Sequence, residues 1–513
     1  MIQGRQLSRK AVAKSVTIAA PTGGLNGKDS IANMPTQDAY ILDNWFPNAT
    51  SVVQRNGKKA WATGIPAAVN TLAIYNGAST SKMFAACAAK IYDVTATGAV
   101  GAAVVTGLAS DKFQWCQMGT IGGRFLCMFN GVDNGQYFDG ASWISVSMGA
   151  GATQIANVNP TNIISCNIYK SRMYLLEKNT ANVWYLPLNA IYGAATKLDL
   201  SSLLSRGANI IAMATWTIDN SAGLQEYAVF LSSDGDVLVY EGADPSTSSF
   251  TLAARFSVGR PAGYRCFEKI GSDLAVIGAD GIFPLSKALV TDRSQEKYAL
   301  TDKIVTLVSA DFQSYANNFG WQIIIYPIGN KLILNVPTVA GTTSYQYVMN
   351  TITNAWCRFT GWNAFCWATQ NDKLFYGGYG AVYQADTTTS DDGINIVADA
   401  QQAFQYFGVP TKKVFNMIRP VIVSTASVSP SIIMNVDFDI QKPLDTSTFT
   451  DFTTTLWGSP WLSPWSTELR VNKDWQTCTG IGIAGGVRLL VASNKANVSW
   501  SSTDIIFETG NVL

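Results

Sequence analysis

A short pattern that recurs seven times between residues 83 and 386 constrains the fold of this chain more than any other feature. Each copy has an apolar run, a cluster of turn-forming residues and a second run with aromatic or branched side chains. Turn pairs such as Asn130-Gly131, Asp234-Gly235 and Asp280-Gly281 tolerate positive φ, so each copy predicts a β-hairpin. The paired runs are 83–87 with 91–93, 125–129 with 137–139, 173–176 with 183–185, 228–231 with 237–240, 274–277 with 282–283, 332–334 with 345–348, and 374–376 with 382–383.

The spacing of these hairpins predicts how they assemble. Successive copies start about 40 to 60 residues apart, close to the period of four-stranded propeller blades. A single hairpin cannot bury its own apolar face, and a closed ring of hairpins leaves no long free edges. We therefore expect an all-β chain with a β-propeller of six or seven blades over 71–390. A large antiparallel sandwich, or several small sheets, would contain hairpins of the same kind.

Size and composition indicate a folded protein with a large core. The chain has 513 residues, of which 47% are hydrophobic and 14% are charged. A chain of this length buries about 75% of the surface that it exposes when unfolded. The balance of 36 basic and 35 acidic residues gives a net charge of +1, so the molecule as a whole does not attract nucleic acid or anionic membranes.

Targeting and redox signals are weak. The longest apolar stretches, such as 321–328, are shorter than the roughly 18 residues that a membrane span needs, so we expect no integral span. The apolar segment 15–20 is too short for a signal-peptide core. The eight cysteines show no CxxC pairing and lie mostly in apolar strands, which predicts buried free thiols in a protein made in a reducing cytoplasm.

The chain contains no histidine. This excludes Ser-His-Asp and Cys-His nucleophilic sites and every metal site that needs histidine. Paired carboxylates could still hydrolyse a glycoside, and the candidate pairs are Asp234 with Asp236 and Asp391 with Asp392. Both pairs lie in turns or polar loops, where acidic residues are expected for solvation. We predict that the chain is not an enzyme.

Cofactor motifs are also missing from the sequence. The segment 386–393 (DTTTSDDG) carries oxygen ligands that could hold calcium, but its spacing does not fit a dedicated calcium loop, and a solvated linker is the simpler interpretation. Neither GxxxxGK[ST] nor a strand-borne GxGxxG occurs. We therefore expect no nucleotide, metal or other cofactor.

The two ends of the chain do not show the repeated hairpin pattern. Residues 1–70 contain extended pieces joined by proline and glycine turns, and residues 391–513 return to strands, with clean alternation over Met434–Asp439. Such alternation is typical of a half-buried antiparallel strand. We predict a C-terminal β-sandwich or barrel that the N-terminal strands complete.

Two segments in these ends are candidate interfaces. Trp457, Trp461 and Trp465 are separated by prolines, which forbid a helix, so their rings project from an extended loop. They either anchor a partner subunit or cover an edge of their own subunit. The N-terminal arm carries four cations that either dock onto a neighbouring protein or DNA phosphates, or form a solvated terminus: Arg5, Arg9, Lys10 and Lys14.

Short strings at both ends resemble the tail nozzle proteins of short-tailed bacteriophages, a family that includes tail tubular protein B and packaged-DNA stabilisation proteins. The strings are 21–26 (PTGGLN), 42–47 (LDNWFP), 55–57 (RNG), 457–465 (WGSPWLSPW), 488–490 (RLL) and 507–510 (FETG). They carry no catalytic signature.

The resemblance implies a propeller inserted into a platform domain built from both termini. It further implies a hexameric ring below the portal and adaptor proteins, a conduit for passing double-stranded DNA, contacts with tail fibres or spikes, and a plug or needle below. We therefore expect a structural virion protein that is made in the host cytoplasm and located in the virion tail. The alternatives are a carbohydrate-binding propeller with Trp143, Trp184 or Trp362 as sugar platforms, and the carboxylate glycosidase.

Overall fold

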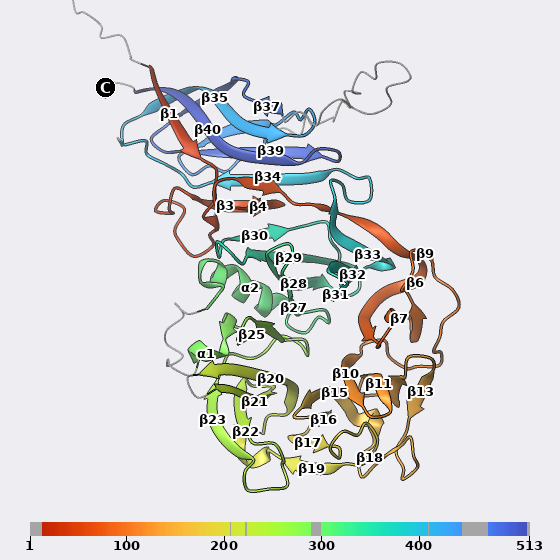
Figure 1. Cartoon of the computed structure of the whole chain (residues 1–513). Coiled ribbons are helices and arrows are strands. Elements are labelled where there is room, and N and C mark those ends of the chain that lie inside the picture. The colour runs from red at the N-terminus through yellow and green to blue at the C-terminus, as the bar shows by residue number, and fades with distance from the viewer. Residues whose placement is uncertain are drawn as a thin grey trace, which may run out of the picture. The chain divides into compact units, whose positions relative to one another are not determined.

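The computed structural model describes residues 13–205, 207–220, 223–288, 299–408, 410–443 and 470–509. The described chain is almost entirely β (Figure 1). It divides into two compact units. The first comprises residues 1–57, 348–359 and 387–513, and the second comprises 58–347 and 360–386. Relative to the expected boundaries at 70 and 390, the first unit ends earlier and also takes up 348–359.

The second unit contains all seven predicted hairpins. They are confirmed as β7–β8, β11–β12, β16–β17, β21–β22, β25–β26, β28–β29 and β32–β33. Their bounds are β7 Ser81–Cys87, β8 Lys90–Asp93, β11 Gly123–Phe129, β12 Gly135–Phe138, β16 Arg172–Glu177, β17 Asn182–Tyr185, β21 Gly223–Ser232, β22 Asp236–Glu241, β25 Asp273–Gly278, β26 Gly281–Pro284, β28 Lys331–Val339, β29 Thr343–Asn350, β32 Lys373–Gly377 and β33 Tyr379–Thr388.

An additional strand precedes each hairpin and pairs with its first strand. These strands are β6 Gly57–Asn76, β10 Gln114–Thr120, β15 Ile163–Tyr169, β20 Ile210–Asn220, β24 Phe267–Ile270, β27 Gln322–Tyr326 and β31 Cys366–Gln370. A fourth strand follows four of the hairpins, namely β13 Trp143–Val146, β19 Thr196–Asp199, β23 Thr251–Ser257 and β30 Trp356–Phe359. The repeated motif is therefore an antiparallel blade of three or four strands.

Four of these blades are separate sheets, which gives a four-blade propeller-like arrangement: β10–β13, β15–β19, β20–β23 and β24–β26. The first and last hairpins instead share a seven-stranded sheet, because the long strand β6 pairs with β33 as well as with β7. The predicted all-β propeller is confirmed. The expected number of six or seven blades is not found: four blades form separate sheets, and the strands of the other three hairpins belong to larger sheets.

Helices and short strands connect these blades. They are β9 Gly98–Ala99, β14 Ile155–Ala156, β18 Gly193–Ala194, α1 Leu285–Ala288, α2 Val305–Tyr315 and the 3-10 turns Pro160–Asn162, Ser201–Leu203 and Asp302–Ile304. Buried apolar side chains from neighbouring blades pack together, as when Leu175 and Cys166 meet Cys127 and Phe129 in one cluster. Among the described residues, no helix combines the length and apolarity that a bilayer span requires.

The first unit contains two antiparallel-rich sheets built from both ends of the chain, as predicted. One sheet has the order β37–β35–β40–β5–β4, with β1 also paired to β40 and β38 to β35. The other runs β30–β3–β34–β39–β36, with β2 beside β3. Phe415 of the first sheet packs where a side chain on Gly485 of the second would stand. The fold is therefore a sandwich.

These sandwich strands are β1 Ala13–Ala19, β2 Gly24–Leu25, β3 Asp38–Asp43, β4 Trp45–Pro47, β5 Val52–Gln54, β30 Trp356–Phe359, β34 Ile396–Gln402, β35 Lys413–Ser424, β36 Ser431–Val436, β37 Arg470–Asn472, β38 Gln476–Gly482, β39 Gly485–Ser493 and β40 Val498–Thr509. The strand predicted over Met434–Asp439 ends earlier than expected. Asp437 and Phe438 adopt positive φ (47° and 68°), and the Asp437 carboxylate accepts the backbone N–H groups of Ile483 and Ala484. Asp437 and Phe438 therefore form a turn that ends the strand.

Candidate functional site

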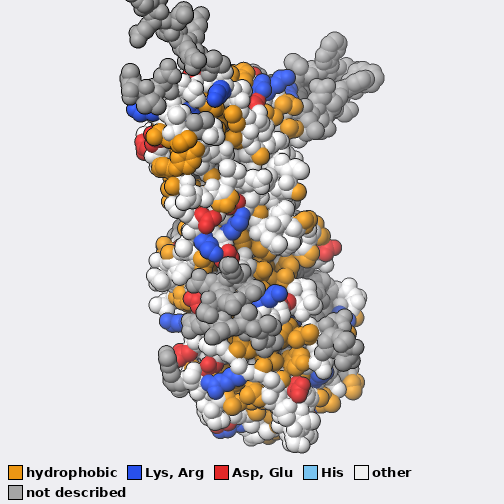
Figure 2. Space-filling model, turned by 90° about the vertical axis from the view of Figure 1, so that its left-hand side faces the viewer, with side chains coloured by type: hydrophobic (Ala, Val, Ile, Leu, Met, Phe, Trp, Pro, Cys, Tyr) orange, Lys and Arg blue, Asp and Glu red, His pale blue; other side chains and the backbone are white. Residues whose placement is uncertain are grey.

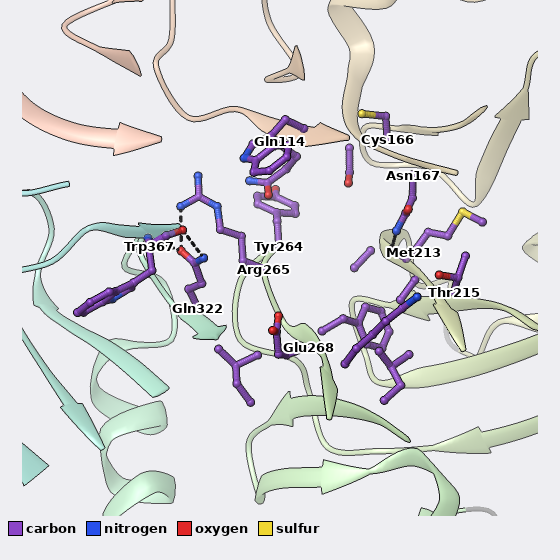
Figure 3. Close-up of a pocket in the computed structure, with 18 of the residues that line it drawn as sticks. Gln114, Cys166, Asn167, Met213, Thr215, Tyr264, Arg265, Glu268, Gln322 and Trp367 are labelled. Carbon is purple, nitrogen blue, oxygen red and sulfur yellow. Dashed lines mark hydrogen bonds between the residues drawn. The ribbon is translucent and has the colours of Figure 1, made fainter. Parts of the chain in front are cut away.

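The strands that precede the seven hairpins surround one cavity of about 400 Å³ (Figure 3). Each of them contributes at least one lining residue, from Leu72 of β6 and Gln114 of β10 to Gln322 of β27 and Trp367 of β31. A shared cavity is what a propeller leaves where its innermost strands converge on the axis. Its volume lies within the range of small-molecule sites, so it is the candidate site of the second unit.

Arg265 is tied into the wall of this cavity. Its guanidinium donates hydrogen bonds to the Asn70 carbonyl (3.0 Å), the Thr71 hydroxyl (3.1 Å) and the Phe113 carbonyl (3.1 Å). Burial lowers the pKa of Arg265 from its usual value. Because three strongly directional bonds go to the surrounding chain, the cation mainly joins segments from different blades.

A second polar link spans neighbouring strands on the same wall. The Gln322 side chain donates to the Trp367 carbonyl (2.9 Å) and accepts from the Trp367 backbone N–H (2.9 Å). In Figure 3 the Trp367 ring points away from Glu268, so this residue presents its backbone to the cavity and its ring to the core. The link fixes β27 against β31.

Glu268 and Gln114 supply the remaining polar groups. The Glu268 carboxyl accepts the Ile325 N–H (3.2 Å), and burial raises the pKa of Glu268 to about 7. The Gln114 side chain is 8% exposed, and its amide nitrogen has no hydrogen-bond partner within the described structure. A carboxyl and an amide donor suit water or a small polar molecule. Among the described residues there is no cluster of three His, Cys, Asp or Glu that could hold a metal ion.

Cys166 lines the cavity, and two further buried thiols, Cys116 and Cys127, lie close to it. Cys116 and Cys127 face each other across β10 and β11, and the Cys166 thiol donates to the Cys127 carbonyl (3.6 Å). Burial raises the pKa of Cys127 and Cys166 well above the usual range. All eight cysteines are free and buried, which confirms the prediction of buried free thiols.

Most of the predicted interface residues lie outside the described residues. This holds for Trp457, Trp461 and Trp465 and for Arg5, Arg9 and Lys10. Lys14 is described: it lies exposed in β1, opposite Phe507 of β40. The candidate interfaces therefore stay predictions.

Three of the carboxylates considered for catalysis or calcium binding have structural partners, whereas Asp234 and Asp392 are exposed. Asp236 is 5% exposed and accepts the Ser205 backbone N–H (2.7 Å). Asp386 pairs with Lys331 at 2.7 Å, and Asp391 pairs with Arg55 at 2.5 Å. The cationic side chains beside Asp386 and Asp391 supply the charge that a calcium ion would otherwise provide.

The tryptophans considered as sugar platforms are not equally accessible. Trp362 is 0% exposed, which corrects the expectation that it is available to a ligand. It packs against Trp367 and Tyr376 because it follows directly on a core strand. Trp143 and Trp184 are half-buried, and the Trp184 indole donates to the Glu177 carboxylate (3.0 Å).

Comparisons with known proteins give little further information. No protein-family model matches the chain. No curated protein matches it. Similar solved structures include the computationally designed Ika8 protein, with 10% identity, a TM-score of 0.38 and coverage of 64% of this chain and 100% of that chain. BBS1N in complex with ARL6DN is also similar. In crystals soaked with mercury its identity is 9%, its TM-score is 0.40, and the match covers 66% of this chain and 99% of that chain. In crystals soaked with lead the identity is 11%, the TM-score is 0.40, and the match covers 65% of this chain and 99% of that chain.

Proposed function

We propose that this chain is a structural subunit of a short-tailed phage tail, in which a ring of copies forms the nozzle of the DNA-ejection conduit. The observation that carries the proposal is the composition of the first unit. The described residues of 1–57 fold together with the described residues of 387–513, and the propeller is inserted between these two parts of the chain. This is the arrangement that the resemblance of both chain ends to tail nozzle proteins implies.

Ion pairs within the platform are consistent with a structural role. Paired Arg–Asp contacts join its distant segments, with Arg358 bound to Asp43 through two bonds of 2.7 Å. This pair joins β3, near the N-terminus, to β30, from the middle of the chain. Bidentate pairs of this kind are geometrically specific as well as strong.

The charge distribution suits a wall past which DNA slides. The net charge is +1. On the face drawn in Figure 2, acidic and basic side chains are interspersed, and neither sign covers a continuous area. Since affinity for DNA rises steeply with the number of neutralised phosphates, a surface without a basic stripe would not grip the passing duplex. Within the proposal, the partners are the portal or adaptor protein, tail fibres or spikes, and a plug or needle protein.

The alternative of a carbohydrate-binding propeller has weaker support. Of its three candidate platforms, Trp362 is fully buried and Trp184 is held by Glu177. Sugar binding by aromatic rings needs an exposed face, so Trp143 would have to carry it. Binding of the purified chain to a glycan array, lost in Trp143→Ala, would favour this alternative.

The decisive experiment locates the chain in the particle. Virions from the source system would be labelled with gold-tagged antibody against this protein and imaged by electron microscopy. Label concentrated at the tail is expected. Label absent from virions, with epitope accessibility shown on partly dissociated particles, would refute the proposal.

A further inference from the structure

The axial cavity of the propeller contains polar groups that the fold itself does not use. Its lining carries two cations, Arg265 and Lys269, and a single acid, Glu268. The amide side chain of Gln114 also lines it. Buried polar groups of a folded chain are normally hydrogen-bonded, so groups without partners inside a cavity point to a bound molecule that supplies them.

The Arg265 guanidinium keeps part of its donor capacity unused within the described chain. Its three shorter hydrogen bonds, to Asn70, Thr71 and Phe113, all start from Nη2. Nη1 has a long contact of 3.5 Å with Oε1 of Gln322, and Nε has no acceptor among the described residues. All of these acceptors are uncharged groups, so the bonds leave the positive charge uncompensated.

Gln114 lies beside this cation. It begins β10 directly after Phe113, whose carbonyl accepts the Arg265 bond of 3.1 Å. Gln114 is 8% exposed, and its Nε2 has no hydrogen-bond partner in the described structure. A buried amide donor without an acceptor is costly, so this position favours a ligand that accepts a hydrogen bond.

The charges around the cavity favour an anion with a single negative charge. Arg265 and the exposed Lys269 outweigh Glu268, so full ionisation of all three leaves one positive charge in excess. A carboxylate balances that charge, and its two oxygens can accept from a guanidinium and an amide together. The Phe319 ring covers one face of the guanidinium at 5.1 Å, so the edge that bears the N–H groups is the side for a ligand.

Glu268 offers an acceptor away from these donors. Its carboxyl accepts one hydrogen bond, from the Ile325 N–H at 3.2 Å, and keeps lone pairs for another donor. In Figure 3, Glu268 lies apart from Gln114, with Tyr264 between them in this view. A hydroxyl or ammonium group at the far end of a bound carboxylate would suit Glu268.

We propose that the axial cavity binds a small carboxylate that also carries a hydroxyl or ammonium group. The carboxylate accepts hydrogen bonds from Gln114 and Arg265, and the second group donates to Glu268. A cavity of about 400 Å³ holds a molecule of this size. A conduit for DNA requires no such ligand, so the inference goes beyond the proposed function and holds or fails separately from it.

Calorimetric titration of the purified full-length chain tests the ligand class. The probes are unbranched acids of about two to six carbons, each as the simple acid, the ω-hydroxy acid and the ω-amino acid. The neutral amides of the hydroxy acids are the matched controls for charge. We expect at least one hydroxy or amino acid to bind at least about tenfold more tightly than the corresponding amide, because a hydrogen bond to a charged group is the stronger one.

Substitution of Gln114 tests the site. Gln114→Leu should weaken binding about tenfold, since the ligand loses one donor. The variant is expected to fold, because Nε2 of Gln114 makes no internal hydrogen bond. Gln117→Leu makes the same change on β10 at a residue outside the lining and should bind like the native chain. Replacement of Arg265 would remove internal bonds as well, so Gln114 is the better choice.

Substitution of Glu268 distinguishes the two kinds of ligand. Glu268→Gln should weaken the binding of an amino acid at least about tenfold, because the amide no longer pairs with the ammonium group, and should leave a hydroxy acid within about threefold. Either result supports the proposal. No binding of any probe at about 10 mM, by calorimetry or thermal shift, would overturn it. Equal affinity for acid and amide, or native affinity in Gln114→Leu, would overturn it as well.

Discussion

Arg55 and Asp391, which are 336 residues apart in the sequence, form a buried two-bond ion pair within the sandwich unit. The guanidinium donates to the two carboxylate oxygens over 2.9 Å and 2.5 Å. Arg55 is 3% exposed and Asp391 is 8% exposed. The pair joins the N-terminal segment that ends at Gly57 to the start of the C-terminal segment, so it holds together the two parts of the chain between which the propeller is inserted.

Removal of one member of this pair should destabilise the sandwich strongly. Arg55→Met leaves the Asp391 carboxylate buried without its cation, which costs about 3–5 kcal/mol of unfolding free energy. Arg55→Met combined with Asp391→Leu should recover most of that loss, because no charge is then buried unpaired. Urea unfolding followed by tryptophan fluorescence measures both. The exposed pair Lys197 and Asp199 is the control, since Lys197→Met should cost under about 1 kcal/mol.

Gly57 should not tolerate a methyl group. A Cβ at this position would overlap the carbonyl oxygen of Ser390, next to the Arg55–Asp391 pair. Gly57→Ala is therefore expected to cost about 1–3 kcal/mol, the usual range for overpacking. Gly101→Ala is the matched control, because nothing lies within 4 Å of the position that its Cβ would occupy. Equal melting temperatures for the two variants would contradict the expected close approach.

The contrast between these contacts and the hairpins shows what the sequence can reveal. All seven hairpins were predictable because each depends on residues within one short segment, such as the positive-φ turn at Gly235 between two apolar runs. The pairing of the N-terminal strands with the C-terminal sandwich was predictable because residues 1–70 contain extended segments joined by proline and glycine turns. The register of that pairing did not, because Arg55 carries no local signal for Asp391. The axial cavity was likewise not predicted, since its lining comes from strands spread over most of the propeller.

The alternation of polar and apolar residues predicted one strand end wrongly. Asn435 and Asp437 appear as equivalent polar positions in Met434–Asp439, yet Asn435 is buried and bonded to Gln401 (2.6 Å), whereas Asp437 caps a turn. In both roles the polar side chain makes the hydrogen bonds that it needs. Only the neighbouring strands decide which role a given position takes.

Glu268 should make the stability of the propeller depend on pH. Burial raises the pKa of this carboxyl from 4.5 to about 7, so between these values the folded chain binds more protons than the unfolded chain. The resulting stabilisation is fully present below about pH 4.5 and is lost as the pH rises through about 7. Because Glu268 is only half-buried by area, we expect a loss on the order of 1–2 kcal/mol.

Glu268→Gln tests this dependence because the amide does not titrate. The difference in unfolding free energy between Glu268→Gln and the native chain should increase in favour of the variant from about pH 5 to about pH 8. Glu226→Gln, whose side chain is 43% exposed, should show no such trend. A flat difference for Glu268→Gln would mean that the carboxyl ionises freely in the folded cavity.

The cysteines should be unreactive until the chain unfolds. Burial raises the pKa of Cys266 and of Cys366 to about 12, and only the thiolate attacks a disulfide reagent. Hydrogen bonds with Cys127 and Cys166 lower the pKa of Cys116 to about 5, so burial alone keeps a reagent away from that thiol. Ellman's reagent should therefore label the native chain slowly and label eight thiols in guanidinium chloride. Ser15→Cys, with its exposed side chain, should add one rapidly reacting thiol. Rapid labelling of several native thiols would show that the blades open locally.

Trp461 should act on assembly and not on folding if the proline-flanked tryptophans anchor a partner. Trp461→Ala is then expected to leave the melting temperature within about 2 °C of the native value, since truncation of an exposed interface residue removes few internal contacts. The same variant should fail to incorporate into tails when it complements particles that lack this protein. Trp475→Ala is the matched comparison, because it makes the same Trp-to-Ala change at a ring in the sandwich that is 36% exposed. A lower melting temperature for Trp461→Ala with normal incorporation would assign that ring to the core of its own subunit.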